Sequence, residues 1–307
     1  MQHIISANQF KKNDLENILS LAGVLEQDSK EGKIKKILED KIVACVFFEP
    51  STRTRLSFET AALKLGAKVI SAENAMENSS AHKGESIEDT TRILCSYADV
   101  VVIRHPAGGT LEKAVKVATK PLINAGDGTN QHPSQGLLDV YTIKKEKGRL
   151  KNLNIGFGGD LLNSRTLKSL VPLLQLYEGN KFYFISPKEL ELPREFMNAL
   201  EENKVQFEEL RSIEEALPHL DVLYMTRVQK ERFADVREYE KVKDLFIFKK
   251  EHLKILKPDA IIMHPLPKIN EIEIEVDADP RAAYFRQAEN GLYVRMALLS
   301  YVLELDY

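Results

Sequence analysis

The sequence predicts an α/β protein with two doubly wound domains, each built around a parallel sheet. Short apolar runs alternate with helical patterns along the whole chain of 307 residues. No repeat, low-complexity tract or linker rich in Pro, Gly and Ser interrupts this alternation. Hydrophobic residues make up 43% of the chain and charged residues 29%, which is ordinary for globular domains with buried cores.

The first half of the chain contains apolar segments that are typical of buried strands, at residues 42–48, 69–70 and 100–103. Helical patterns follow them at residues 54–65, 87–97 and 111–118. Strands that alternate with helices in this way form parallel sheets, because the crossing helix returns the chain to the same edge.

The second half repeats this arrangement. Strand patterns occupy residues 154–157, 181–185, 221–225 and 260–263. Helical patterns occupy residues 164–176, 193–203 and 286–303. A further helix at residues 135–146 joins the two halves, so we expect a hinge within residues 133–150.

The composition excludes several classes of protein. The formal net charge of −3 gives no overall attraction for nucleic acid. No apolar run reaches the ~20 residues that cross a bilayer, and the N-terminus lacks the pattern of a signal peptide, so we expect a cytoplasmic protein. Neither Cys45 nor Cys95 belongs to a C-x-x-C pair, so we expect two reduced core cysteines. No His, Cys or carboxylate cluster indicates a catalytic metal, and we expect no cofactor.

Ligands of open α/β sheets bind beyond the carboxyl ends of the strands, so the residues there are the first candidates. The first strand leads into Ser51-Thr52-Arg53-Thr54-Arg55 at the start of a helix. Backbone N–H groups and the helix dipole attract an anion at such a position, and arginine adds a fork that fits phosphate. A simple N-cap would explain one hydroxyl, but not three hydroxyls and two arginines together. The run therefore predicts a phosphate site.

Two other strand ends of the first half carry polar side chains. Arg104 follows the strand at 100–103, where a surface position and a ligand contact are equally consistent with the sequence. His132 and Gln135 lie at the entry of the helix at 135–146, after a loop that begins at Gly126. An imidazole there can donate to a developing oxyanion, although a structural role is the simpler reading of one isolated histidine.

The second half places Arg165 near the start of a helix and Arg227 after a strand, where each can face a carboxylate. Gly158 and Gly159 predict a tight strand–helix turn and not a dinucleotide site, because Leu161 occupies the place of the third glycine. Strand ends in both domains thus carry an arginine. This pattern predicts a cleft between the domains that holds a small molecule with several negative charges; the residues are Arg53, Arg104, Arg165 and Arg227.

The segment Phe48–Glu59 resembles the carbamoyl-phosphate signature of the aspartate and ornithine carbamoyltransferase family. The resemblance extends over essentially the whole chain and includes Lys83–Glu85, Arg104–Pro106, His132–Gln135 and Gln287–Leu292. It implies a carbamoyl-phosphate-binding domain at residues 1–133 with the C-terminal helix 286–307, and a domain for the second substrate at residues 134–285. It also implies a homotrimer whose active sites lie in the cleft between the domains and at the subunit interface.

The second substrate depends on fewer residues. Thr226–Arg232 and His264–Pro267 resemble the members of the family that use aspartate. Members that use ornithine carry Ser-Met-Gly and His-Cys-Leu-Pro sequences at these places, and this chain has neither. The resemblance therefore implies transfer of a carbamoyl group to L-aspartate, a step of pyrimidine biosynthesis. The alternatives are a carbamoyltransferase that uses ornithine or another amine, and a non-catalytic anion-binding homologue.

The resemblance also assigns roles to individual residues. The carbamoyl-phosphate set is Ser51, Thr52, Arg53, Thr54, Arg104, His132 and Gln135. The aspartate set is Lys83, Arg165, Arg227, Gln229, Leu266 and Pro267. The catalytic residues are Arg53, Thr54, Lys83, Arg104 and His132.

The remaining assignments concern domain closure and the neighbouring subunit. Glu49 and Arg232 would serve domain closure, and Ser79 and Lys83 would enter the neighbouring subunit's site. His82 stands where some relatives carry a second lysine, so the charge of this loop differs. Regulatory chains or another enzyme of the pyrimidine pathway are candidate partners.

Overall fold

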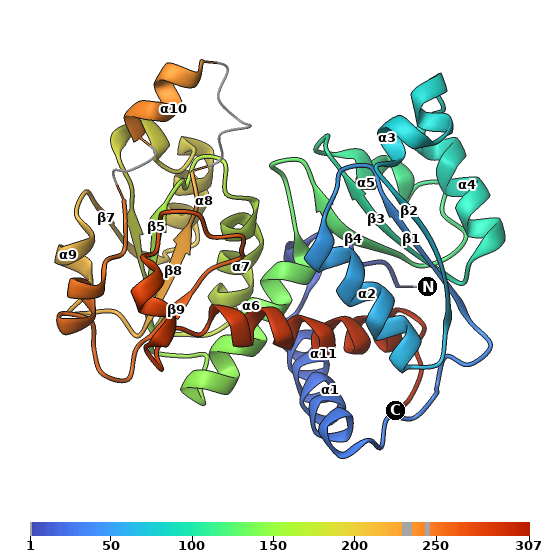
Figure 1. Cartoon of the computed structure of the whole chain (residues 1–307), viewed down its shortest axis with the longest axis horizontal. Helices are drawn as coiled ribbons and strands as arrows, with labels where there is room; N and C mark the ends of the chain where they lie inside the picture. The colour runs from blue at the N-terminus through green and yellow to red at the C-terminus, as the bar shows by residue number, and fades with distance from the viewer. Residues whose placement is uncertain (1, 229–234, 243–245) are drawn as a thin grey trace. The chain divides into compact units, whose positions relative to one another are not determined.

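The computed structural model describes residues 2–228, 235–242 and 246–307 and divides into two compact α/β units (Figure 1). Unit 1 comprises Met1–Tyr141, Lys168–Leu173 and Glu289–Tyr307, and unit 2 comprises Thr142–Leu167 and Leu174–Ala288. One boundary falls inside helix α6 (Pro133–Lys147), between Tyr141 and Thr142. Each unit contains one parallel sheet, so the fold class predicted from the sequence is confirmed.

The sheet of unit 1 has four parallel strands in the order β2-β1-β3-β4. The strands are β1 (Ile42–Phe47), β2 (Lys68–Glu73), β3 (Val100–His105) and β4 (Leu122–Asp127). The helical elements are η1 (Ala7–Gln9), α1 (Lys12–Glu31), α2 (Thr52–Lys64), α3 (Ala75–Asn78), η2 (Ser80–Lys83), α4 (Ile87–Tyr97) and α5 (Thr110–Ala114), together with parts of α6 and α11 (Tyr284–Val302).

Helices cover both faces of this sheet. Alternate residues of β1, Ala44 and Val46, pack in one buried cluster with Cys95 of α4 and Leu111 of α5. Helix α2 contacts β1 and β2, and its Phe58 side chain is fully buried. A sheet enclosed on both faces explains why β1 and β3 are continuous apolar runs in the sequence.

The sheet of unit 2 has five parallel strands in the order β7-β6-β5-β8-β9. The strands are β5 (Asn154–Gly159), β6 (Lys181–Ile185), β7 (Gln206–Leu210), β8 (Val222–Thr226) and β9 (Ile261–Met263). The helical elements are η3 (Lys188–Leu190), α8 (Arg194–Glu202), α9 (Ile213–Ala216), α10 (Val236–Val242), η5 (Lys250–Lys254) and η6 (Ile274–Ala278), together with parts of α6 and α11 and the two ends of α7 (Arg165–Gln175), whose middle, Lys168–Leu173, belongs to unit 1.

Aromatic side chains fill part of the core of unit 2. The ring of Phe157 on β5 lies 5.8 Å from the rings of Phe184 on β6 and Tyr224 on β8, measured between centroids. A second buried cluster contains Leu223 and Met225 of β8. Successive residues of β8 therefore face different clusters, as the period of a strand requires.

Two local predictions are wrong. Gly158 and Gly159 do not form a strand–helix turn but are the last residues of β5, which pairs with β8 up to Thr226. The predicted loop from Gly126 begins later, because Gly126 and Asp127 are the last residues of β4. In both cases small or polar residues belong to a strand because the neighbouring strand continues beside them.

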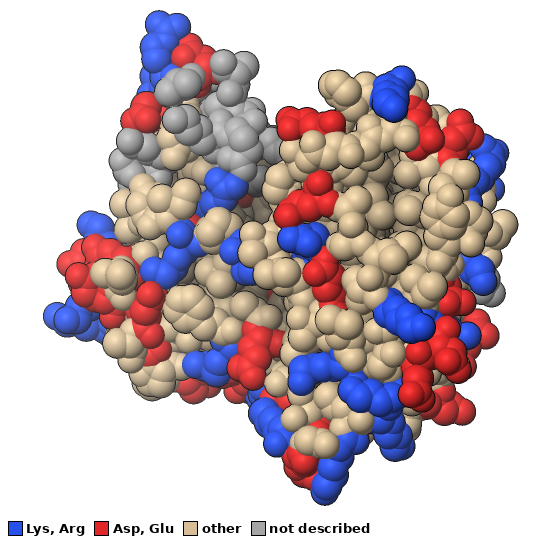
Figure 2. Space-filling view, turned by 45° about the vertical axis from the view of Figure 1, so that its right-hand side comes forward, with Lys and Arg blue, Asp and Glu red and all other residues tan. Residues whose placement is uncertain are grey.

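No helix within the described residues is both long and apolar enough to cross a bilayer. Figure 2 shows basic and acidic side chains interspersed over the face in view, as the small net charge of −3 leads one to expect.

Candidate active site

Each sheet has a point where the chain winds outward in opposite directions from two adjacent strands. In unit 1 this switch lies between β1 and β3, and in unit 2 it lies between β5 and β8. Ligands of open α/β sheets bind beyond the strand ends at such switch points. The predicted arginines stand there within their own units: Arg53 follows β1, and Arg165 and Arg227 follow β5 and β8. Arg104 was expected after its strand but is the fifth residue of β3, which continues to His105.

The first turn of α2 is arranged as an anion site. Ser51 precedes the helix in an extended conformation and its side chain makes no capping hydrogen bond, so the simple N-cap alternative does not describe it. Thr54 is buried, whereas Arg53 is exposed. Helix N-termini whose N–H groups lack a side-chain cap attract phosphate through those groups and the helix dipole.

The two arginines of this turn differ in their surroundings. Arg55 is engaged by acids of unit 1: its Nη1 lies 3.1 Å from Oε1 of Glu59 and its Nη2 lies 2.8 Å from Oε2 of Glu73. Arg55 therefore joins α2 to β2, and Arg53 is the arginine of this turn that the structure leaves on the exposed surface. The pattern of residue types did not separate these two arginines, whereas the resemblance assigns a role to Arg53 only.

Arg104 lies on β3, between the neighbouring strands β1 and β4. The register of β1 and β3 places it beside Phe47, and its Nη2 lies 2.6 Å from Oε1 of Glu49. Its Nη1 donates to the carbonyl oxygen of Ala125 at 3.4 Å. The side chain is only 12% exposed, so the alternative of an ordinary surface arginine is wrong. Glu49 was expected to serve domain closure, and the structure shows it beside Arg104.

His132 and Gln135 lie where β4 passes into α6. His132 is buried, its backbone N–H donates to Oγ of Ser169 at 2.8 Å, and its Nδ1 lies 3.3 Å from Oγ of Ser134. The amide Nε2 of Gln135 donates to Oδ1 of Asp139 at 2.8 Å. Strands β1, β3 and β4 are parallel neighbours, so this turn lies at the same edge of the sheet as Arg104.

Asp127 holds that turn in place. Its buried carboxylate accepts from the N–H of Gly109 at 2.9 Å and from the N–H of Gln131 at 3.1 Å. Burial raises the pKa of Asp127, and these hydrogen bonds oppose the rise. Nothing in the sequence singles out this residue beyond its place in a glycine-containing segment.

Ser79 and Lys83 lie on the segment between β2 and α4. Oγ of Ser79 accepts from the N–H of Ala81 at 3.2 Å and so begins the short helix η2, which ends at Gly84 with φ 91°. Lys83 is exposed. Because β2 is the edge strand of the sheet, this segment lies at the border of unit 1 and not over the switch point.

In unit 2 the ends of β5 and β8 are tied together. Oγ1 of Thr226 donates to the carbonyl oxygens of Gly158 and Asp160 at 3.1 and 3.2 Å. A side chain at Gly159 would collide with the carbonyl oxygen of Thr226, which explains the glycine. Arg165 is the first residue of α7, and Arg227 directly follows β8. The predicted aspartate residue Gln229 and the closure residue Arg232 lie outside the described residues.

The segment after β9 has a fixed shape. The peptide bond between Leu266 and Pro267 is cis, and Leu266 has φ 55°. Nδ1 of His264 accepts from the N–H of Leu266 at 2.8 Å. Nε2 of His264 lies 2.7 Å from Oε1 of Glu271, and both side chains are buried. Burial lowers the pKa of His264, although Glu271 opposes this shift.

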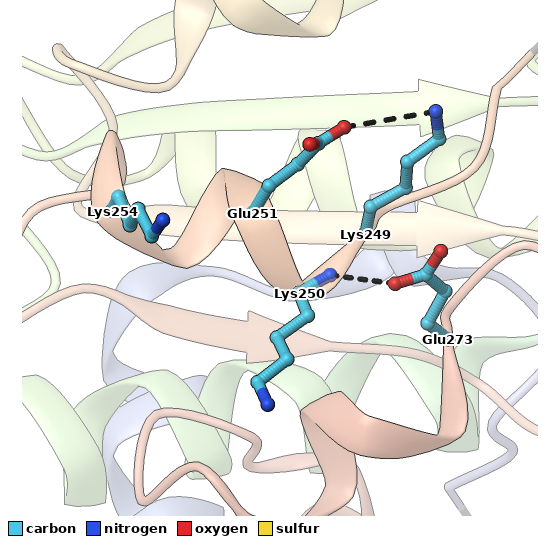
Figure 3. A pocket seen from close by; sticks show the side chains of 5 residues that line it. All are labelled: Lys249, Lys250, Glu251, Lys254 and Glu273. Atoms are coloured by element: carbon cyan, nitrogen blue, oxygen red, sulfur yellow. Dashed lines mark hydrogen bonds and ion pairs between the residues drawn. The ribbon is translucent and has the colours of Figure 1, made fainter.

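Two other features bear on ligand binding. In the part of the chain that the structure describes, no group of three or more His, Cys, Asp or Glu is placed to hold a metal ion. A hollow of about 350 Å³ on unit 2 is lined by Lys249, Lys250, Glu251, Lys254 and Glu273 (Figure 3). Its charges are partly paired, since Nζ of Lys249 lies 3.7 Å from Oε1 of Glu251 and the N–H of Lys250 donates to Glu273 at 2.8 Å.

Comparison with known families identifies the class. Residues 2–145 match the model described as "Aspartate/ornithine carbamoyltransferase, carbamoyl-P binding domain". Residues 151–302 match "Aspartate/ornithine carbamoyltransferase, Asp/Orn binding domain". The chain belongs to the aspartate/ornithine carbamoyltransferase family.

The similar proteins include members of this family that are named for aspartate. The chain is 48% identical over 305 residues to the aspartate carbamoyltransferase catalytic subunit of Clostridium novyi (strain NT), which covers 99% of both chains. It is 49% identical over 301 residues to the multifunctional protein pyr1-3 of Dictyostelium discoideum, covering 98% of this chain but 13% of that protein. A crystal structure of aspartate transcarbamoylase from Trypanosoma cruzi in complex with carbamoyl phosphate and aspartate has a TM-score of 0.92 and 36% identity, covering 97% of this chain and 95% of that one.

Proposed function

We propose that this chain transfers the carbamoyl group of carbamoyl phosphate to the amino group of L-aspartate, giving N-carbamoyl-L-aspartate and phosphate. The observation that carries the proposal is the presence of arginines at the switch point of each sheet, Arg53 and Arg104 in unit 1 and Arg165 and Arg227 in unit 2. One pair suits a phosphate with an adjacent carbonyl, and the other suits two carboxylates. The ligands named for the similar Trypanosoma cruzi structure support this choice.

Carbamoyl phosphate binds to unit 1 in this proposal. The N-terminus of α2 takes the phosphate through backbone N–H groups, the side chains of Ser51 and Thr52, and the guanidinium of Arg53. Thr54, Arg104 and His132 face the carbamoyl oxygen, and Gln135 faces the carbamoyl NH2 group. The carbamoyl group thus sits over the strand ends, beside the helix that holds the phosphate.

The reaction is an attack of the neutral aspartate amine on the carbamoyl carbon. The new C–N bond forms a tetrahedral intermediate, whose oxyanion Arg104, Thr54 and His132 stabilise. The C–O bond to phosphate then breaks, and the leaving phosphate accepts the proton of the amine. Removal of a single oxyanion donor costs roughly 10²–10³ in rate in other enzymes. Binding two anions that repel each other in water supplies the rest of the rate enhancement.

L-Aspartate binds to unit 2 through the arginines at the second switch point. Arg165 and Arg227 take its two carboxylates, and Gln229 adds an amide contact. Leu266 and Pro267 line the site, and the hydrogen bond between Leu266 and His264 holds their backbone. Ornithine is the less suitable acceptor, because the ammonium of its side chain would face an arginine where it needs an acid.

We infer that the functional assembly is a homotrimer in which Ser79 and Lys83 enter the neighbouring subunit's site. The surface of unit 1 supports an interface near this segment. Helix α4, which contacts η2, exposes Ile93 (49%) and Tyr97 (61%). Residues four apart lie on the same face of a helix, and large apolar side chains exposed together are typical of surfaces that bury against a partner. Glu49 and Arg232 would close the domains around the substrates.

We place the reaction in pyrimidine biosynthesis and the protein in the cytoplasm. A relative that forms part of the multifunctional protein pyr1-3 supports the pathway, and makes other enzymes of that pathway candidate partners beside regulatory chains. Cys45 and Cys95 are both free and buried, as is usual in a reducing compartment. Burial raises the pKa of Cys45 to about 12, so its thiol is unreactive.

Phosphate release from carbamoyl phosphate tests the proposal, with aspartate and ornithine supplied in parallel to the purified protein. Release with aspartate alone, together with N-carbamoyl-L-aspartate, is the expected result. Release with ornithine would keep the phosphate site and overturn the assignment of the second substrate. Binding of carbamoyl phosphate with no release for either amine would favour a non-catalytic homologue.

A further inference from the structure

Gln135 is held by Asp139, a residue to which neither the sequence pattern nor the resemblance assigns a role. Its Nε2 donates to Oδ1 of Asp139 at 2.8 Å, one helical turn further along α6. Gln135 is 8% exposed and Asp139 is 0% exposed, so this hydrogen bond is screened from water. Residues four apart lie on the same face of a helix, which allows the contact.

A buried cation balances the charge of Asp139. Arg295 on α11 is 3% exposed. Burial lowers the pKa of Arg295 to about 10, and the charge of Asp139 opposes this shift, so the guanidinium remains charged at neutral pH. It lies 5.2 Å from the centre of the Phe58 ring, and a side chain at Gly291 would collide with its Nη1. The guanidinium is therefore fixed in position by its surroundings.

The partner of Gln135 determines which way its amide faces. An ionised carboxylate accepts hydrogen bonds and donates none. The amide must therefore direct its NH2 group to Asp139, which leaves Oε1 as the atom that can face a ligand. An amide without such a partner is able to present either its oxygen or its nitrogen.

We propose that Asp139 is a positioning residue that makes Gln135 a hydrogen-bond acceptor for the carbamoyl NH2 group, and thereby selects carbamoyl phosphate over acyl phosphates that lack this donor. The proposal rests on the proposed function and deepens it. Acetyl phosphate is the closest such acyl phosphate, with a methyl group in place of NH2. Its methyl group would leave Oε1 of Gln135 without a donor, and unpaired buried polar groups are what give such sites their selectivity.

Asp139→Asn is the first test, because asparagine can donate as well as accept and no longer fixes the amide of Gln135. Dissociation constants for carbamoyl phosphate and acetyl phosphate would be measured by calorimetry on wild type and variant. We expect the affinity for carbamoyl phosphate to fall about tenfold, which corresponds to the loss of roughly one hydrogen bond. The affinity for acetyl phosphate should change less than about twofold. If Asp139→Asn does not fold, the smaller Asp139→Ser replaces it.

A double-mutant cycle separates positioning from a general structural role. Gln135→Met removes the acceptor, so we expect loss of the preference for carbamoyl phosphate, and adding Asp139→Asn should change the preference no further. Asp40→Asn, an exposed position of unit 1 with the same change of charge, is the matched control. Equal losses for both ligands in Asp139→Asn, or additive effects in the cycle, would overturn the inference alone. A wild-type chain that binds no carbamoyl phosphate would overturn the proposed function with it.

Discussion

Nε2 of His264 lies 2.7 Å from Oε1 of Glu271, and the two side chains are 0% and 4% exposed. The other nitrogen of the ring, Nδ1, accepts from the N–H of Leu266 at 2.8 Å, so it carries no proton. The hydrogen of the neutral ring is therefore on Nε2 and faces Glu271. Oε2 of Glu271 accepts from the N–H groups of Ile269 and Asn270, both at 3.1 Å. The His264 ring thus links Leu266, through Glu271, to the backbone of Ile269 and Asn270.

Two substitutions of His264 separate its hydrogen bond with Leu266 from its contact with Glu271. Asparagine keeps an acceptor near the position of Nδ1, whereas glutamine keeps a donor near Nε2 but has no acceptor for Leu266. If Leu266 lines the aspartate site, His264→Gln should raise the KM for aspartate roughly 10-fold, the effect of losing about one hydrogen bond. His264→Asn should raise it much less. Affinity for carbamoyl phosphate should stay unchanged in both, and equal KM values for the two variants would contradict this account.

The same pair predicts how stability depends on pH. Burial lowers the pKa of His264, with Glu271 opposing. Burial acts to raise the pKa of Glu271, but its hydrogen bonds, first that of His264, bring it below its usual value. Both groups bind protons more readily in the unfolded chain than in the folded one. The free energy of unfolding should therefore fall as pH drops below about 6.5, the ordinary pKa of histidine, and fall further below about 4.3, that of glutamate.

Urea unfolding at a series of pH values measures this dependence. His264→Asn should show a shallower decline than wild type between about pH 7 and pH 5, because one of the groups with a lowered pKa is gone. His3 and His105, whose pKa values burial also lowers, remain in both proteins and contribute equally. His219→Asn, at an exposed position, is the control and should follow wild type. An identical slope in His264→Asn would show that this ring does not contribute.

The sequence predicted the central strands and the edge strand β9 well, but it shortened the edge strand β2 and missed the edge strands β4 and β7. Strand β1 is buried along almost its whole length and is therefore an apolar run. The edge strands β2 and β7 each contain several exposed residues, so the first was predicted too short and the second was missed. An edge strand gains its backbone hydrogen bonds from one neighbour only, and that pairing is not written in its own residue pattern.

The residues of the candidate site were also predicted only in part. The rule for strand ends identified Arg53 and Arg104 directly. Asp139 could have been found as the residue four positions after Gln135 on a predicted helix, which is the spacing of side-chain pairs. Glu271 could not have been found in this way, because an irregular segment brings it to His264 and such segments have no periodicity. The separate role of Arg55 also depends on tertiary contacts, since Glu73 comes from a different element.

Arg53 and Arg55 form a matched pair for testing the phosphate site. Arg53→Ala should lower kcat/KM by roughly 10²–10³-fold or more, because a charged donor to the substrate is lost. Arg53→Lys should recover only part of the lost kcat/KM, since lysine lacks the planar guanidinium that can bind two phosphate oxygens at once. Arg55→Ala breaks the contacts with Glu59 and Glu73 and should mainly lower the melting temperature. Similar kinetics for Arg53→Ala and Arg55→Ala, measured by phosphate release, would contradict the site.

Gly159 lies at the second switch point, where β5 packs closely against β8. Its φ of 109° is unfavourable for other residues, and a side chain would meet the carbonyl oxygen of Thr226. Gly159→Ala should therefore destabilise by more than about 1–3 kcal/mol, the usual range for backbone strain alone. At Gly148 φ is also positive (68°), but no atom lies within reach of an added side chain. Gly148→Ala therefore measures the backbone strain without the collision. Equal losses for the two variants in urea unfolding would mean that β5 moves away from β8.

Lys83 tests whether neighbouring subunits share each active site. If Lys83 acts in the neighbour's site, Arg53→Ala and Lys83→Ala trimers are both inactive, yet a hybrid trimer contains one site in which both residues are intact. Dissociating and reassembling equal amounts of the two variants should therefore restore about a quarter of wild-type activity, because random mixing makes about three quarters of the trimers hybrid and one site in three is intact. Each variant carried through the procedure alone is the control. No recovery, with hybrid trimers detected by native mass spectrometry, would mean that Lys83 serves the site of its own chain.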